Sequence, residues 1–395
     1  MIDEREILRL TSIVRTELDM SEEQSEEEVR RLIARIVYRE TEDENLSLKE
    51  RETLVKNIFD SIRKLDVLQE LIEDEEISEI MVNGYDRIFI EKKGTILEWN
   101  KKFSSVEKLE DVIQQIVSEC NRVVNESEPI VDARLSNGER VNIVLSPPAV
   151  TGPIITIRRF PKEVFTMGKM IENKSITPEA ASFLETVVRA GYNVFVSGGT
   201  SSGKTTLLNV LSDFIPSGER VITIEDSAEL QIKSVENLVR LETRNANSSG
   251  CEAITIKDLI KTALRMRPDR IIVGEVRGAE VADMLQAFNT GHEGSLSTGH
   301  ANSSYDMLTR LEAMYIQNAE IPLEAVRMQI ASGIDIMIHL ERGRDGVRRV
   351  TEINEITHGE NKNILLNKLF ETQITGRDYN LVKVGQLINT RKMNR

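Results

Sequence analysis

The sequence predicts an α/β protein built in three parts, because three patterns of apolar residues follow one another along its 395 residues. Up to about residue 65, apolar residues recur at helical spacing. From about residue 72, short apolar runs alternate with turn dipeptides, which is typical of strands. After about residue 176, strand-like and helical stretches alternate, which is typical of a largely parallel sheet. We therefore expect a helical bundle at 1–66, an α+β domain at 67–160, a linker at 161–176 and an α/β domain at 177–395.

The composition limits the classes of partner. Charged residues make up 29% of the chain and the formal net charge is −14. Proteins that neutralise a phosphate backbone are more often basic, so we expect no direct contact with nucleic acid. The acidic start MIDEREILRL is unlike a signal peptide, and no stretch of about 18 apolar residues occurs. The sequence thus favours a cytoplasmic protein that reaches a membrane only through partners.

The first part reads as three amphipathic helices. Their apolar positions are Ile7, Leu10, Val14 and Leu18, then Val29, Leu32, Ile33 and Ile36, then Leu54, Ile58, Ile62 and Leu65. The acidic stretches between them suit loops and helix starts, since acids favour the first turn of a helix. A small bundle with solvated acidic faces is one interpretation, and a docking module for a partner is the other.

The second part carries the strand-like stretch ISEIMVNGYDRIFIE, interrupted by the turn dipeptide Asn83-Gly84. A helical pattern ending near Cys120 follows it, and the stretches VDARL, RVNIVL and IITIRRF then read as three more strands. We expect an α+β domain of roughly 90 residues.

The third part offers four strands, namely YNVFVSG, RVITIED, DRIIVGE and GSLSTGH. Each of them ends in polar residues. Ligands gather at the carboxyl ends of strands in parallel sheets, so the site is expected there.

A phosphate-binding loop follows the first of these strands. Gly198, Gly203, Lys204 and Thr205 satisfy the pattern G-x-x-x-x-G-K-[ST], and an apolar helix follows them. The expected nucleotide-binding residues are Gly198, Gly199, Thr200, Ser201, Ser202, Gly203, Lys204, Thr205 and Thr206. Lys204 would reach the β- and γ-phosphates, and the Thr205 hydroxyl would bind Mg²⁺. The ligands that this pattern predicts are therefore ATP or ADP with Mg²⁺.

Three further strand ends carry side chains suited to hydrolysis. Glu225 ends the strand VITIE, and Glu275 follows RIIVG in the manner of a Walker B strand. His300 follows a strand of small residues, where an imidazole can bond a phosphate or a catalytic acid. Any one of these three residues alone is equally consistent with an ordinary solvated or structural side chain.

The four motifs in this order resemble those of the secretion-ATPase superfamily of type II and type IV secretion and type IV pili. SGGTSSGKTT is similar to its Walker A motif, VITIEDSAEL to its Asp box, RIIVGEVRGAE to its Walker B motif and GSLSTGHANS to its His box. The stretches ISEIMVNG, LVRLETR, LIKTALRMRPDRIIVGEVRGAEVADML and GVRRVTEINEI most resemble the CpaF branch, the motor of tight-adherence (Tad) pili. The resemblance covers about residues 66 to 356.

The resemblance implies a RecA-like P-loop ATPase domain behind the α+β N-terminal domain and the leading helical bundle. It implies that Glu225 positions or deprotonates the attacking water and that Glu275 holds Mg²⁺, although either acid can serve as the base. It also places Arg134 and Arg158, with their neighbour Arg159, among arginines that meet the γ-phosphate. The other interpretation of these arginines is pairing with surface acids.

By the same resemblance the chain would act as a homo-hexamer at the inner face of the cytoplasmic membrane. It would transmit motion to polytopic platform proteins and through them to pilins, in extension or in retraction of a pilus.

Three alternatives stay open. One is a type IV secretion ATPase of the VirB11 kind that serves conjugation, and another is a scaffold that binds ATP but hardly hydrolyses it. The third is a RecA-class nucleic-acid motor, which the low aromatic content of 4% disfavours because single strands stack on aromatic side chains.

Overall fold

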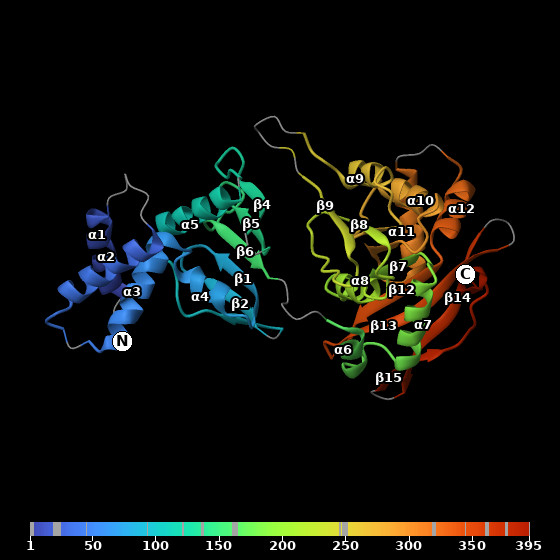
Figure 1. Cartoon of the computed structure of the whole chain (residues 1–395), viewed down its shortest axis with the longest axis horizontal. Coiled ribbons are helices and arrows are strands. Elements are labelled where there is room, and N and C mark those ends of the chain that lie inside the picture. The colour runs from blue at the N-terminus through green and yellow to red at the C-terminus, as the bar shows by residue number, and fades with distance from the viewer. Residues whose placement is uncertain are drawn as a thin grey trace. The chain divides into compact units, whose positions relative to one another are not determined.

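The chain divides into two compact units, Met1–Lys162 and Glu163–Arg395, which are described separately (Figure 1). The computed structural model describes residues 4–18, 25–44, 46–92, 94–120, 122–135, 138–159, 165–244, 246, 252–317, 321–343, 345–359, 363–375 and 378–394. Among these residues, no helix combines the length and the apolar character needed to cross a bilayer.

Three helices open the first unit, as the periodicity predicts: α1 (Glu4–Glu17), α2 (Glu26–Glu40) and α3 (Leu48–Arg63). The second and third begin at capping boxes, in which a serine hydroxyl accepts the backbone N–H three residues on and a glutamate accepts the serine's own N–H. The pairs are Ser25 with Glu28 and Ser47 with Glu50. Such caps fix where each helix starts, and each contributes about 1 kcal/mol.

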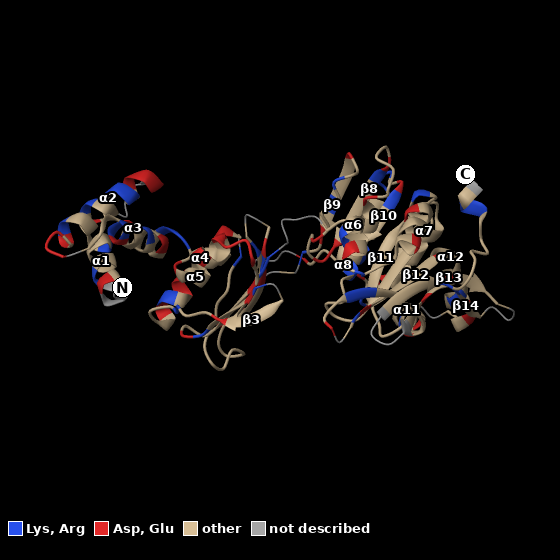
Figure 2. Ribbon diagram, turned by 90° about the horizontal axis from the view of Figure 1, so that it is seen from below, with Lys and Arg blue, Asp and Glu red and all other residues tan. Residues whose placement is uncertain are grey.

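The apolar stripes of these helices bury one another. Val14, Ile33 and Ile58 are fully buried in a cluster made only of residues from this helical segment. Arg39 Nη2 of α2 pairs with Glu17 Oε1 of α1 at 2.6 Å, and Figure 2 shows acidic and basic residues spread along the helices. The amphipathic helices are confirmed, and their charged faces are solvated.

A six-stranded antiparallel sheet follows among the described residues of the first unit, in the order β3-β2-β1-β6-β5-β4. Its elements are α4 (Val67–Glu73), β1 (Ile77–Asn83), β2 (Ile88–Lys92), β3 (Thr95–Glu98), α5 (Val106–Glu119), β4 (Ile130–Arg134), β5 (Arg140–Val144) and β6 (Ile154–Arg158). Helix α5 buries Leu109, Ile113 and Ile116 in one cluster with strand residues such as Ile80 and Ile155. The helix thereby covers one face of the sheet.

The second unit holds a nine-stranded sheet among its described residues, in the order β15-β14-β13-β12-β7-β11-β10-β8-β9. The strands are β7 (Val194–Gly198), β8 (Arg220–Glu225), β9 (Asn237–Glu242), β10 (Arg270–Val273), β11 (Leu296–His300), β12 (Ile336–Arg342), β13 (Arg348–His358), β14 (Ile364–Thr375) and β15 (Asp378–Lys383). Strands β7 to β12 pair in parallel, and β13 to β15 extend the sheet in antiparallel fashion. The predicted α/β fold with a largely parallel sheet is confirmed.

Helices cover both faces of this sheet. They are α6 (Met167–Glu172), α7 (Pro178–Arg189), α8 (Lys204–Ser212), α9 (Ile256–Ala263), α10 (Val281–Asn289), α11 (Ser304–Ile316) and α12 (Leu323–Gly333). Along β7, Val194 and Val196 pack with α6, α7 and α8, while Phe195 packs with α9 to α12. Because both faces are buried, these strands read as continuous apolar runs. Helix α6 lies inside the range predicted as a linker, and Met170 joins the core.

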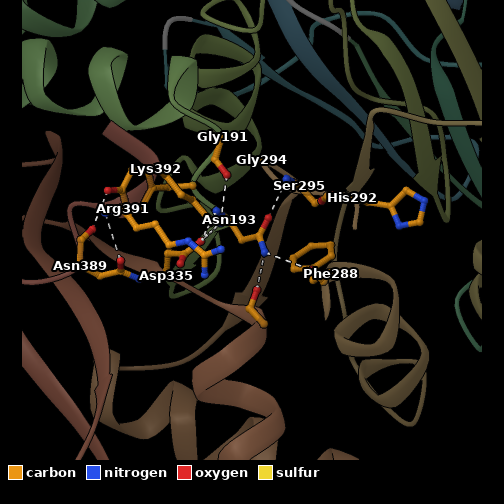
Figure 3. A network of polar contacts seen from close by, with 12 residues as sticks. Gly191, Asn193, Phe288, His292, Gly294, Ser295, Asp335, Asn389, Arg391 and Lys392 are labelled. Atoms are coloured by element: carbon orange, nitrogen blue, oxygen red, sulfur yellow. Dashed lines mark hydrogen bonds and ion pairs between the residues drawn. The ribbon is translucent and has the colours of Figure 1, made fainter. Parts of the chain in front are cut away.

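The last residues of the chain are tied to the amino ends of the central strands (Figure 3). Asp335 Oδ2, just before β12, accepts from Asn193 N and from Lys392 Nζ, each at 2.7 Å. The Tyr192 hydroxyl donates to Asn389 O at 2.6 Å. This end of the sheet is a structural junction, and the opposite end carries the predicted chemistry.

Candidate active site

The phosphate-binding loop connects the end of β7 to the start of α8. A Cβ atom at Gly198 would lie 2.6 Å from Leu340 O and 2.6 Å from Ser202 Oγ, so only glycine fits there. Gly203 caps α8 with φ +97°, a left-handed conformation that side chains rarely adopt. The two glycines thus allow the tight turn that aims the amino end of α8 at an anion.

The lysine of the loop is folded against it. Lys204 is only 6% exposed, and its Nζ donates to Gly198 O at 3.1 Å and to Gly199 O at 2.9 Å. Burial lowers the pKa of Lys204, while the nearby Glu275 raises it and Arg277 lowers it. A phosphate group would offer this ammonium stronger, charged acceptors than the two carbonyls.

A series of polar contacts connects Lys204 with residues at the ends of three other strands. His300 Nδ1 lies 3.1 Å from Lys204 Nζ, and His300 Nε2 lies 2.7 Å from Glu275 Oε1. Arg277 Nη2 pairs with Glu275 Oε2 at 2.8 Å, and its Nη1 lies 3.6 Å from Asp226 Oδ2. Because β7, β11, β10 and β8 are successive neighbours in the sheet, their carboxyl ends bring these residues together.

The surroundings of His300 favour the neutral form of its ring. Burial and the charge of Lys204 lower the pKa of His300, with Glu275 opposing the shift. A neutral ring accepts at one nitrogen and donates at the other, and the lysine can only donate. We therefore assign the proton to Nε2, on the side of Glu275.

Glu225 ends β8 and is 3% exposed. Its Oε2 accepts from Glu229 N at 2.7 Å and from Leu230 N at 2.9 Å, while Oε1 is buried without a hydrogen-bond partner among the described residues. Burial raises the pKa of Glu225 to about 7, although the two backbone hydrogen bonds lower it. A Cβ at Gly274 would lie 2.9 Å from Glu225 Cγ, so that glycine leaves room for the carboxylate. A carboxyl poised near neutrality can take a proton and return it.

The site has the donors and acceptors that a nucleotide with Mg²⁺ requires. The buried Ser202 Oγ in the loop, like Glu225 Oε1, has no hydrogen-bond partner among the described residues, so both are free to meet a ligand. The Thr205 hydroxyl at the start of α8 and the Glu275 carboxylate are oxygen ligands of the kind that Mg²⁺ prefers. The residues present therefore fit both groups.

The predicted arginines belong to the sheet of the first unit. Arg134, on β4, faces Arg140 of β5, and Arg140 faces Arg158 of β6. Directly paired residues share one face of a sheet, so these three arginines form a row. Arg134 Nε also donates to Gly138 O at 2.9 Å, and Arg158 is exposed. A role at the γ-phosphate stays a prediction.

Arg159 differs from that row. Its Nε pairs with Glu139 Oε1 at 2.8 Å, both side chains are 9% exposed, and its Nη1 donates to the backbone of Asp74 and of Ile77. Successive residues of a strand point to opposite faces, which explains why neighbouring arginines have different environments. Arg159 ties parts of the first unit together.

Two further arginines, one in each unit, were not predicted from the sequence. Arg140 was hidden in the stretch RVNIVL, and only the pairing of β4, β5 and β6 puts it in the row. Arg348 of β13 donates its Nε–H to Ser201 O in the phosphate loop at 2.9 Å, across 147 residues of sequence. No local pattern in the sequence signals such a contact.

The matching family and the three relatives described here are all named for secretion or conjugal transfer. The family described as Type II/IV secretion system protein matches residues 62–364. A putative conjugal transfer protein of Mycobacterium tuberculosis is 32% identical over 75% of this chain and 85% of its own length. Conjugal transfer protein TrbB of Rhizobium radiobacter is 32% identical over 78% of this chain and 92% of its own. Type IV secretion system protein PtlH of Bordetella pertussis is 32% identical over 73% and 93%.

Solved structures are similar in fold. The Legionella pneumophila ATPase DotB superposes with a TM-score of 0.53 at 22% identity, over 74% of this chain and 80% of that one. The pilus retraction motor PilT superposes with a TM-score of 0.54 at 20% identity, over 84% and 85%. At these identities the likeness concerns the fold alone.

Proposed function

Since the chain belongs to the Type II/IV secretion system protein family, it is a secretion ATPase that hydrolyses ATP, and we propose that it drives a conjugal transfer or type IV secretion apparatus of the VirB11 kind. The observation that carries the proposal is the set of relatives named for conjugal transfer and type IV secretion. Each of them is 32% identical and aligns with about three quarters of this chain.

The proposed chemistry starts with binding of the phosphates. The loop from Gly198 to Thr206 would surround them with backbone N–H groups, and Lys204 would exchange its carbonyl partners for phosphate oxygens. Thr205 and Glu275 would hold Mg²⁺, which when bound neutralises charge that develops on the transferred phosphoryl group. His300, between Lys204 and Glu275, would keep both side chains oriented toward that group.

Glu225 is the proposed general base. Its Oε2 is fixed by two backbone N–H groups, which leaves Oε1 to accept a proton from the attacking water. A pKa of about 7 lets the carboxylate accept that proton and lose it again in each cycle. Glu275 pairs with Arg277 and His300, so it is better placed as a holder of charge than as a base.

A second candidate is the motor of a Tad pilus. It is favoured by the long CpaF-like stretch from Leu259 to Asn302, and by helices α1 and α2, which precede the range matched by the family. In both cases the proposed assembly is a homo-hexamer at the inner face of the cytoplasmic membrane that passes motion to membrane partners. Transport of pilins belongs to the second candidate only.

Deleting the gene in its native host distinguishes the two candidates. The first predicts that transfer of a mobilisable plasmid, or secretion, is lost while surface pili persist, and the second predicts the reverse. Re-expression of the wild-type chain restores the lost process, and Glu225→Gln at the same protein level does not. If the deletion leaves both processes intact, or if Glu225→Gln restores them, the motor proposal is wrong.

A further inference from the structure

The phosphate loop contains a residue in an unfavourable backbone conformation. Ser201 has φ +57°, and only Gly198 and Gly203, which bear no Cβ, share a positive φ within the loop. For a residue with a side chain, the left-handed conformation costs free energy unless surrounding contacts hold it. The loop therefore requires an external contact at Ser201.

The contact comes from the antiparallel part of the sheet. Arg348 Nε donates to Ser201 O at 2.9 Å, and a Cβ on Gly203 would lie 3.3 Å from Arg348 Cδ, so the arginine stem lies against the same loop. The backbone of Arg348 is held in the sheet, because Arg348 is the first residue of β13 and lies opposite Arg342 in the antiparallel register with β12. Strand β12 itself runs beside β7, which leads into the loop.

The geometry explains what this contact does. A loop that binds an anion through its N–H groups must turn its carbonyl groups outward. Arg348 holds the Ser201 carbonyl from outside the loop and uses Nε to do so, which leaves the two terminal nitrogens of the guanidinium for solvent or ligand. Neither the phosphate-loop motif nor the Walker B and His motifs include this residue.

We propose that Arg348 is a positioning residue for nucleotide binding, which holds Ser201 in its left-handed conformation and so keeps the loop shaped for a phosphate group. It acts through the loop backbone and is not a catalytic residue. This inference rests on nucleotide binding by the loop, and it adds a part of the site that lies outside the four nucleotide-binding motifs of the sequence.

The test measures the dissociation constant of a fluorescent ADP analogue for the full-length protein. Arg348→Ala is expected to weaken binding about 10-fold, since Ser201 then bears the cost of its backbone conformation alone. The double variant Arg348→Ala with Ser201→Gly is expected to bind ADP within about 3-fold of the wild-type affinity, because glycine adopts a positive φ without that cost. Arg348→Met keeps part of the stem but has no N–H donor, so it is expected to resemble Arg348→Ala.

Arg349→Ala is the matched control. Arg349 is the next residue on the same strand, and its contacts are with Asp345 and the Tyr379 ring. Its loss is expected to change ADP affinity less than about 3-fold, because neighbouring strand residues point to opposite faces. At saturating ATP, kcat of Arg348→Ala is expected to stay within about 3-fold of the wild type, since a positioning residue acts on binding.

Each other result has a definite meaning. Unchanged ADP affinity in Arg348→Ala, no rescue by Ser201→Gly, or an equal loss in Arg349→Ala overturns the assignment while the proposed function stands. A large fall in kcat with unchanged affinity also overturns it, because Arg348 would then be catalytic. A wild-type protein without affinity for ADP overturns the assignment and the proposed function together.

Discussion

At the scale of single residues, the site combines groups that the sequence indicates with groups that it hides. Lys204, His300 and Glu275 follow three different strands, and the rule that parallel strands end at one edge predicts their meeting. The phosphate loop is equally readable, since its glycines obey a backbone requirement. The contact of Arg348 with Ser201 was not predictable, because it depends on the pairing of β12 with β7 and β13.

Glu225 gives the sharpest residue-scale prediction. Its folded pKa is about 7 against an ordinary value of 4.5, so between these pH values the folded chain binds a proton that the unfolded chain has released. Stability therefore falls as the pH rises through this window. Glu225→Gln is expected to raise the free energy of unfolding at pH 8 by up to ~3 kcal/mol, and the gain is expected to fade toward pH 4.5.

Urea unfolding of the full chain at pH 8, 6 and 5, followed by circular dichroism, measures this difference. The exposed Glu236 supplies the control, and Glu236→Gln is expected to change stability little at any of these values. A stability difference for Glu225→Gln that is the same at pH 8 and at pH 5 would show that burial does not perturb this carboxyl.

At the scale of elements, periodicity predicted the helices and the central strands well. The three N-terminal helices begin or end close to their acidic stretches, and β7, β8, β10 and β11 coincide with the apolar runs. Strand β9 was missed, since it lies at the sheet edge and its residues are mostly exposed or half-buried, without a continuous apolar signal. Helix α6 was missed because it is short and buries one residue, Met170.

The contact between the C-terminal residues and the start of β12 gives a prediction about stability. Lys392 pairs with Asp335 at 2.7 Å, and these side chains are only 12% and 14% exposed (Figure 3). Burial raises the pKa of Asp335 above its ordinary value, and the ammonium group of Lys392 opposes that shift because it favours the charged carboxylate. Lys392→Met is expected to destabilise the protein by about 3 kcal/mol, since it leaves the buried Asp335 carboxylate without its cationic partner.

The double substitution Asp335→Asn with Lys392→Met is the control for that result. It is expected to recover more than half of the stability lost in Lys392→Met. The amide of the new asparagine lies next to Asn193 N and carries no charge that needs a partner. Thermal and urea unfolding of Lys392→Met, of Asp335→Asn and of the double variant, each compared with the wild type, form the cycle. Additive losses in the double variant would contradict a coupled ion pair.

At the scale of the whole molecule, the protein is an ATPase with two compact units, one of which carries all the nucleotide motifs. Family membership could be inferred from those motifs, and the match over residues 62–364 agrees. The sequence does not fix the cargo. The nucleotide motifs predict the chemistry of the site, but no short motif of this sequence indicates which partner the protein moves.

The most direct test of an assembled ATPase with Glu225 as its base measures phosphate release per subunit as the protein concentration rises, with Glu225→Gln measured alongside. We expect the specific rate to climb as oligomers form and then to level off. The variant is expected to lose at least about 100-fold in rate at every concentration, because it lacks the general base. A specific rate that does not change with concentration would contradict the assembled motor. A Glu225→Gln variant that keeps the wild-type rate would show that Glu225 is not the general base.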